Sequence, residues 1–314
     1  MNKMVQNKNL KSNFQCLTAL DDLEYFAMDS VSDEILYRSI KEALESVGKT
    51  YAKTVIEHIC KINRLSEREI LTNCDLFEDS MYRLFGHSAL SVINKVKVSA
   101  LRHALIECKS TLTIPEILDP ALTINNILNE IRRIEALEFV HKMSSYNHIA
   151  YLYSNKISLS KILSEYFSPR GAAKGLLSEN PQEYILFDLS YSISYKNLFG
   201  ENTNSLNDDA VTKVRRWIDT VRSSNRSSLP TRIAEDDATW WIRNGNLRAL
   251  TSLERLLCRE LPENTSILCA FDISKLNQKQ LGTLKTVIGS HDYVIIEEPA
   301  HTVFKYGKPM FRYE

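Results

Sequence analysis

The stretch YNHIAYLYSNK, residues 146–156, is followed at once by ISLSKILSEYF, residues 157–167. Apolar residues in the first stretch predict a strand, and the second has the spacing of an amphipathic helix. Strand, polar break and helix in this order are typical of a nucleotide-binding α/β domain. In such domains the break is a glycine-rich loop that holds phosphates. Here the break is Ser154-Asn155-Lys156 and contains no glycine.

The same alternation continues to the end of the chain. It indicates a mainly parallel sheet with helices on both faces, an α/β domain over residues 145–314. A terminal hairpin is expected over residues 300–313. The predicted strands are 148–153, 183–190, 229–234, 266–272 and 293–298, and the predicted helices are 158–167, 208–224, 247–261 and 275–291.

The first half of the chain has a helical period. Residues 32–108 predict a small all-α domain, in which Ser66 and Glu69 are placed as a capping box. Residues 1–31 are expected to be a disordered leader. Residues 109–144 are expected to be a linker and a connector helix. Isoleucines at 124, 127, 131 and 134 form a stripe on that helix, and it either pairs with a second chain over 123–143, giving a homodimer, or packs along its own domain.

Composition excludes several function classes. The 314 residues include 39 Lys plus Arg and 39 Asp plus Glu, so a broad nucleic-acid-binding face is not expected. No apolar run reaches the roughly 18 residues of a membrane span, and the N-terminus lacks the apolar core of a secretory signal. The six cysteines are scattered without a CxxC pair. These features predict a cytoplasmic protein with reduced thiols and no membrane partner.

Motifs for catalysis and for cofactors are missing. The nine glycines form neither a phosphate loop nor a dinucleotide fingerprint. Lys156 and Asp272, which ends an apolar run as Asp188 does, are the residues that a degenerate nucleotide site would use. His58 with Cys60, and His103 with Cys108, are out of helical register for a shared metal ion. We therefore predict no catalytic residue, no cofactor and no metal, and not an enzyme.

The segment LPTRIAEDDATWWIRNG, residues 229–245, carries the main candidate site. A strand ends near Arg232, and acids and tryptophans follow it. Because ligands bind beyond the carboxyl ends of parallel strands, this loop could line a pocket. The alternative is structural: an ion pair of Arg232 with a glutamate, and a tryptophan that fills the core.

These residues resemble the methanogen/methylotroph sensory (MEDS) domain. The resemblance covers about residues 145–300 and rests on several elements in order: His148 with Tyr153, Thr231-Arg232 with Glu235 and Trp241, Glu254, Leu268-Cys269 with Phe271-Asp272, and His291. It implies a RecA/KaiC-like architecture that lacks a working phosphate loop and that senses small organic molecules. The predicted ligand-binding residues are His148, Arg232, Glu235, Trp240, Trp241, Glu254 and Asp272. The chain departs from the family in GAAKGLLSENPQEY and SSNRSSLP, which leaves that edge of a pocket undefined.

The first half resembles an archaeal output domain named after Nitrosopumilus. The resemblance covers about residues 33–105 and rests on LESVG, SEREI, Phe77 and Phe85-Gly86 with Ala89. Together the two resemblances imply a cytosolic signal-transduction protein, in which a non-catalytic sensor of a small organic ligand is coupled to an output domain with its own protein partner. One alternative is a degenerate nucleotide-binding ATPase that uses Lys156 and Asp272. Another is transcriptional regulation through DNA, with Lys95, Lys97 and Arg102 as a thin basic face.

Overall fold

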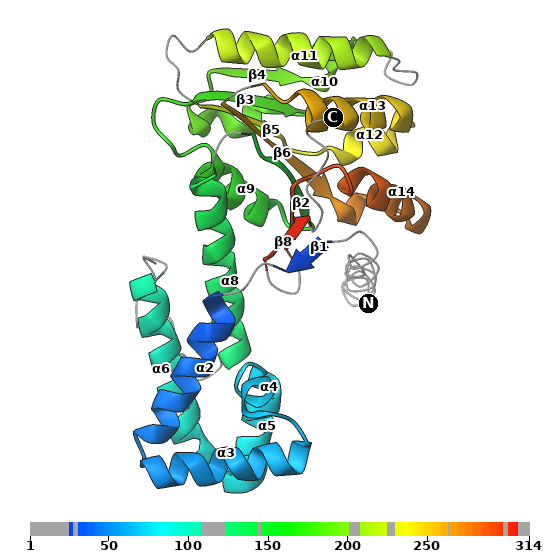
Figure 1. The fold of residues 1–314 in the computed structure, drawn as a ribbon. Helices are drawn as coiled ribbons and strands as arrows, with labels where there is room; N and C mark the ends of the chain where they lie inside the picture. The colour runs from blue at the N-terminus through cyan, green and yellow to red at the C-terminus, as the bar shows by residue number, and fades with distance from the viewer. Residues whose placement is uncertain are drawn as a thin grey trace, which may run out of the picture. The chain divides into compact units, whose positions relative to one another are not determined.

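The computed structural model (Figure 1) describes residues 25–27, 31–107, 123–143, 146–200, 208–224, 230–262, 264–297 and 301–306. The predicted linker over 109–122 and the first 24 residues lie outside these ranges. Internal contacts divide the chain into a helical unit, residues 29–135, and an α/β unit, residues 1–28 with 136–314. The division falls inside helix α8 (Ile124–His141), earlier than the predicted boundary at residue 145.

The helical unit is built as its periodicity predicts. Its elements are α2 (Val31–Glu45), α3 (Lys49–Asn63), α4 (Glu67–Leu71), α5 (Cys74–Phe85), η2 (Gly86–Ser88), α6 (Ala89–Glu107) and the first turns of α8. The capping box at α4 is confirmed: Ser66 Oγ accepts from the Glu69 amide, and the Glu69 carboxylate accepts from the Ser66 amide at 2.8 Å. One apolar core, which includes Leu36, Phe77 and Met81, joins these helices.

The isoleucine stripe of α8 is buried inside the chain. Ile124, Ile127 and Ile131 are between 0% and 4% exposed and belong to the core of the helical unit. A coil between two chains needs this stripe on the surface. The stripe therefore packs along its own domain, as the alternative predicts, and a homodimer through 123–143 stays a prediction without this stripe as its interface.

The α/β unit contains a sheet of eight described strands in the order β1-β8-β7-β2-β6-β5-β3-β4. Strands β7 through β4 in this order are parallel, β8 is antiparallel to β7, and β1 is antiparallel to β8. The predicted α/β class with a mainly parallel sheet is confirmed. The bounds are β1 (Tyr25–Ala27), β2 (His148–Tyr153), β3 (Ala173–Ser178), β4 (Tyr191–Ser194), β5 (Thr231–Glu235), β6 (Thr265–Asp272), β7 (Tyr293–Ile296) and β8 (Thr302–Tyr306).

Helices cover both faces of this sheet. The α9 face carries α9 (Lys156–Tyr166) and the last turns of α8, which pack on odd-numbered residues of β2 such as Tyr151. The α13 face carries α10 (Tyr195–Phe199), α11 (Asp208–Ser223), α12 (Thr239–Arg243), α13 (Leu247–Glu260) and α14 (Gln278–Ile288). Because side chains alternate along a strand, each strand residue belongs to one face or the other.

Two predictions need correction, and a third is tested only in part. Residues 183–190 were expected to form a strand, but Pro181–Phe187 is the short helix η3, and β3 lies before it. Gly175 interrupts the apolar pattern of β3, so the sequence did not predict this strand. Packing requires the glycine, because a Cβ there would lie 2.8 Å from Val221 Cγ2 of α11. Residues 25–27 belong to the sheet instead of a disordered leader. Of the terminal hairpin, β8 is present and its second arm lies outside the described residues.

Candidate functional site

The carboxyl ends of β2 and β6 form the topological switch point of the sheet. The two strands are neighbours, but the chain leaves β2 toward α9 on one face and leaves β6 toward α14 on the other. Ligands of open α/β sheets bind at such a point. The strand-end crevice at this place is lined by Tyr153, Lys156, Glu179, Asn180, Glu183, Tyr184, Asp236, Asp237 and Lys275.

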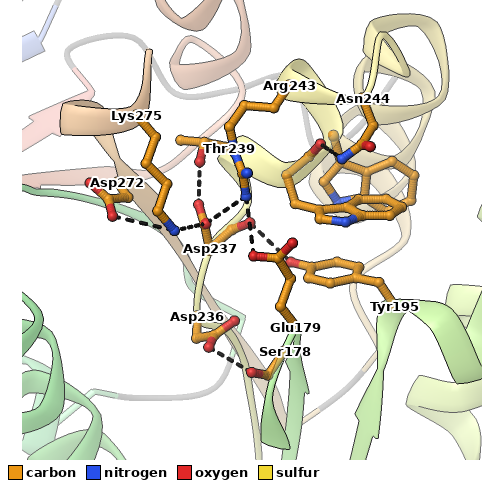
Figure 2. Close-up of polar contacts among 12 residues, drawn as sticks. Ser178, Glu179, Tyr195, Asp236, Asp237, Thr239, Arg243, Asn244, Asp272 and Lys275 are labelled. Atoms are coloured by element: carbon orange, nitrogen blue, oxygen red, sulfur yellow. Dashed lines mark hydrogen bonds and ion pairs between the residues drawn. The ribbon is translucent and has the colours of Figure 1, made fainter. Parts of the chain in front are cut away.

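Asp237 is the centre of the charge network at this crevice (Figure 2). Its Oδ2 lies 2.5 Å from Lys275 Nζ and 3.0 Å from Arg243 Nη2. Arg243 also lies 3.3 Å from Glu179, and Lys275 lies 3.4 Å from Asp272. Burial alone would lower the pKa of Lys275, but Asp237 and Asp272 raise it above its ordinary value. The network joins the ends of β3, β5 and β6 to α12.

Asp236 is buried beside this network. Burial raises its pKa to about 7, although Ser178 Oγ donates a hydrogen bond of 2.6 Å that opposes the shift. The Tyr153 hydroxyl donates to the backbone carbonyl of Asp236 at 2.9 Å. The crevice therefore places a carboxyl that changes charge near neutral pH next to fixed ion pairs.

The crevice is closed in this conformation. Its cavity volume is about 20 Å³, which holds about one water molecule. Pockets for organic ligands are usually about 300–1,000 Å³. An organic ligand at this crevice therefore requires side chains to move apart.

Glu297, which follows β7, holds the loop between β2 and α9. Its Oε2 accepts hydrogen bonds from the backbone amides of Ser154 at 2.6 Å and Asn155 at 3.2 Å. Amides at a helix N-terminus are the groups that bind phosphate in nucleotide-binding loops. Lys156, the other nucleotide candidate, is exposed and lies 3.5 Å from Glu183. A carboxylate of the protein thus takes the amides that a phosphate would need.

Arg232 does not line the crevice, and this prediction is corrected. Its side chain points to the α9 face, and Glu235, three residues later, points to the α13 face, as strand alternation requires. The Arg232 guanidinium donates four hydrogen bonds of 2.6–3.1 Å to the backbone carbonyls of Val140, His141, Met143 and Tyr166. Arg232 therefore neither lines the crevice nor forms the ion pair with a glutamate that was the structural alternative. It caps the carboxyl ends of α8 and α9.

Glu235 and the two tryptophans form a packed polar core on the α13 face. Glu235 Oε1 accepts from Tyr195 Oη at 2.6 Å and from Trp241 Nε1 at 2.5 Å. Trp240 stacks on Tyr195 with ring centroids 4.3 Å apart. Burial raises the pKa of Glu235 to about 7, and its two donors oppose the shift. The tryptophans are 5% and 0% exposed, so the structural alternative describes them better than an open pocket.

His148 and Glu254 meet two residues that were not among the predicted ligand-binding set. His148 Nε2 lies 3.2 Å from Glu254 Oε2 and 3.4 Å from Cys269 Sγ, and His291 Nε2 lies 3.5 Å from the same glutamate oxygen. All four side chains are at most 2% exposed. We call His148, Glu254, Cys269 and His291 the inner cluster, and all four are residue types that bind metal ions.

Burial favours neutral side chains in the inner cluster. It raises the pKa of Glu254 well above its ordinary value, raises that of Cys269, and lowers that of His291 to about 4. Sequence spacing could not reveal this cluster, because its members come from β2, α13, β6 and the turn after α14. The alternation of side chains along a strand could have revealed part of the cluster, because His148 and Cys269 point to the same face of two neighbouring strands.

The seven predicted residues therefore separate into distinct places. Asp272 lies in the charge network beside the crevice, His148 and Glu254 in the inner cluster, Glu235 with both tryptophans in the polar core, and Arg232 on the opposite face. Spacing along the chain also missed Lys275 and Glu179 as crevice residues, Arg243 as a member of the charge network, and Glu297 as the loop partner. These come from other strands and helices, and strand order brings them together.

In the helical unit, a wider groove of about 470 Å³ lies beside α4, α5 and α8. It is lined by Leu65, Glu69, Thr72, Asn73, Cys74, Asn125, Leu128 and Arg132. The basic face considered for DNA is weakened: Lys97 is 6% exposed, and Arg102 lies 2.7 Å from Glu42.

Comparison of the chain with protein-family models, with curated proteins and with solved structures finds no match. In the described part of the chain, no helix combines the length and apolarity needed to cross a membrane.

Proposed function

We propose that the chain is a cytoplasmic signal-transduction protein in which the α/β unit is a non-catalytic sensory domain of the MEDS type, with RecA/KaiC-like ancestry, and the helical unit is an output domain. The observation that carries this proposal is the contact of Glu297 with the amides of Ser154 and Asn155. A phosphate at this helix N-terminus would have to displace a carboxylate that is 7% exposed. The fold keeps the strand, loop and helix of a nucleotide domain while its own side chain takes the anion position.

The strand-end crevice is the ligand site in this proposal. Its ion pairs can be exchanged for contacts with a ligand, which gives the ligand a different affinity for the closed and opened states. Acidic residues at the crevice and in its network outnumber basic ones: Asp236, Asp237, Asp272, Glu179 and Glu183 against Lys156, Arg243 and Lys275. This balance favours a small organic molecule that carries an amino group or several hydrogen-bond donors.

Strand β5 supplies a route from this site to α8. Its carboxyl end leads into Asp236 and Asp237, and Arg232, in the same strand, holds the last carbonyls of α8. Residues of α8 contribute to the cores of both units, Ile127 to one and Val140 to the other. A ligand that shifts the end of β5 would therefore act on α8, with a coupling free energy of about 1–3 kcal/mol.

A titration with ATP and Mg²⁺ tests the absence of turnover. We expect neither saturable micromolar binding nor release of phosphate from the full chain. Phosphate release that stops in Lys156→Ala would contradict the proposal and support the degenerate ATPase. Gel shifts with genomic DNA at a stated salt concentration test transcriptional regulation, and the burial of Lys97 and the pairing of Arg102 predict no specific shift.

A thermal-shift screen tests the ligand site. The full chain is melted with small amines, alcohols and carboxylic acids, and a true ligand raises the melting temperature. Asp237→Asn should abolish that rise, whereas Asp209→Asn, on the exposed side of α11, should keep it. A rise that survives Asp237→Asn would show that the ligand binds elsewhere.

A further inference from the structure

The inner cluster brings two imidazoles, one thiol and one carboxyl to a single point inside the α/β unit. Each offers one ligand atom, and the four atoms lie within 4.8 Å of one another. The residues come from four segments that are remote in sequence: the start of β2, the middle of β6, α13, and the turn between α14 and β7. Sequence proximity therefore does not explain their convergence.

The spacing of these atoms suits a tetrahedral ion. Zinc bonds of about 2.0–2.3 Å to nitrogen, oxygen and sulfur place neighbouring ligand atoms roughly 3.3–3.7 Å apart. The contacts in the cluster are 3.2 Å for His148 Nε2 with Glu254 Oε2, 3.4 Å for Cys269 Sγ with His148 Nε2, and 3.5 Å for His291 Nε2 with Glu254 Oε2. The other pairs of ligand atoms lie within 4.8 Å, so the side chains would have to draw closer together to hold one ion.

The surroundings orient the ligands as the second layer of a metal site does. His291 Nδ1 lies 3.2 Å from the backbone carbonyl of Ile288. Because a carbonyl only accepts, Nδ1 carries the proton and Nε2 presents its lone pair toward Glu254. Ser290 Oγ lies 2.7 Å from the Val287 carbonyl and 3.2 Å from Glu254 Oε2, and in the described part of the chain the buried Glu254 Oε1 has no hydrogen-bond partner. The carboxyl group as a whole, whose Oε2 faces the cluster, is therefore stabilised either by a proton or by a cation.

We propose that His148, Glu254, Cys269 and His291 bind one zinc-class divalent ion. Four protein ligands that are at most 2% exposed leave no coordination position for substrate, so the ion is structural and ties α13 and the α14–β7 turn to β2 and β6. This inference does not depend on the proposed function, because the cluster lies on the α13 face away from the strand-end crevice. The competing explanation is a metal-free hydrogen-bonded network in which Glu254 carries a proton.

Elemental analysis of the full, tag-free chain tests the proposal. We expect about one zinc ion per chain after purification. Removal with a strong chelator should lower the melting temperature, and one equivalent of Zn²⁺ should restore it. Co²⁺ added to the stripped protein should give a thiolate-to-cobalt charge-transfer band, a readout that needs no mutation.

Variants identify the ligands. Cys269→Ser and His291→Gln should each lower metal affinity by at least about tenfold and weaken the cobalt band. Cys74→Ser is the matched control, since Cys74 is also a buried thiol but lies in the helical unit. It should retain the metal content and the band. A chain that binds neither Zn²⁺ nor Co²⁺ stoichiometrically overturns the proposal, and so does a metal that Cys269→Ser and His291→Gln both retain in full.

Discussion

Strand β5 and the turn that follows its carboxyl end bury ionisable side chains in different ways. At the end, Asp237 pairs with Lys275 and Arg243, so its charge is balanced by opposite charges. Within the strand, Arg232 is met by neutral carbonyls, and Glu235, its last residue, by neutral donors from Tyr195 and Trp241. The comparison teaches that residue type alone does not define a binding site. Whether a charged side chain can exchange its partner for a ligand depends on whether that partner is an opposite charge or a neutral hydrogen-bonding group.

The largest effect is expected from Arg232→Ala. The change leaves four buried carbonyls without their donor and removes the cap of two helices. It should lower the free energy of unfolding by about 3–5 kcal/mol, measured by urea denaturation. Arg232→Lys should recover little, because an ammonium cannot reproduce the fork of the guanidinium. A loss below about 1 kcal/mol would contradict the role of Arg232 as the cap of α8 and α9.

The next effect concerns pH. The pKa values of Glu235 and Asp236, about 7, lie above the ordinary values of 4.5 and 3.8. Between the ordinary and the raised values the folded protein binds protons that the unfolded chain releases. Stability therefore falls as pH rises toward 7, by about 3 kcal/mol for Glu235 and about 4 kcal/mol for Asp236, and changes no further above the raised pKa values.

Melting temperatures at pH 5, 6, 7 and 8 measure this slope. Glu235→Gln keeps an oxygen that accepts from Tyr195 and Trp241 but has no proton to lose. In this variant the melting temperature should change less with pH, because one of the two titrating carboxyls is gone. An unchanged slope would show that Glu235 is ionised in the folded protein. It would also contradict the contrast drawn between the neutral partners of Glu235 and the charged partners of Asp237.

A smaller loss is expected from Glu297→Ala, which extends the comparison to a carboxylate held by backbone amides. The amides of Ser154 and Asn155 lose their acceptor, which should cost about 2 kcal/mol in urea denaturation. Glu183→Ala is the control, because its ion pair with Lys156 is exposed and should change stability by less than about 0.5 kcal/mol. Equal losses of stability in the two variants would show that the contact of Glu297 with the amides contributes no more than an exposed ion pair.

The smallest effect is expected from Lys275→Ala. Asp237 keeps Arg243 as a partner, and the Lys275 side chain is 32% exposed, so the loss should be about 1 kcal/mol. Lys213→Ala, which breaks an exposed pair with Asp209, should change stability by a few tenths of that. A loss as large as that of Arg232→Ala would show that the crevice is a structural core and not an exchangeable site.

The sequence predicted most elements of this fold because local patterns determine them. Period-two and helical stripes gave the positions of β2, β5, β6, β7, α11, α13 and α14, and the capping box placed α4. The pattern failed at β3, where Gly175 serves the packing of α11, and at residues 183–187, where an apolar run forms a short helix. The candidate site was only partly predictable, because adjacency along the chain was taken for adjacency in space at Arg232 and Glu235.

By itself, the sequence determined the α/β class, the helical first half and the absence of a glycine-rich phosphate loop, since these follow from composition and from spacing within one segment. Only the tertiary structure decided which side chains meet. Strand order brought Lys275 to Asp237 and Glu297 to the loop after β2, and it gathered His148, Glu254, Cys269 and His291. The physical reason is that contacts between distant segments depend on how strands pair and on which face each residue occupies, and neither is written in local periodicity.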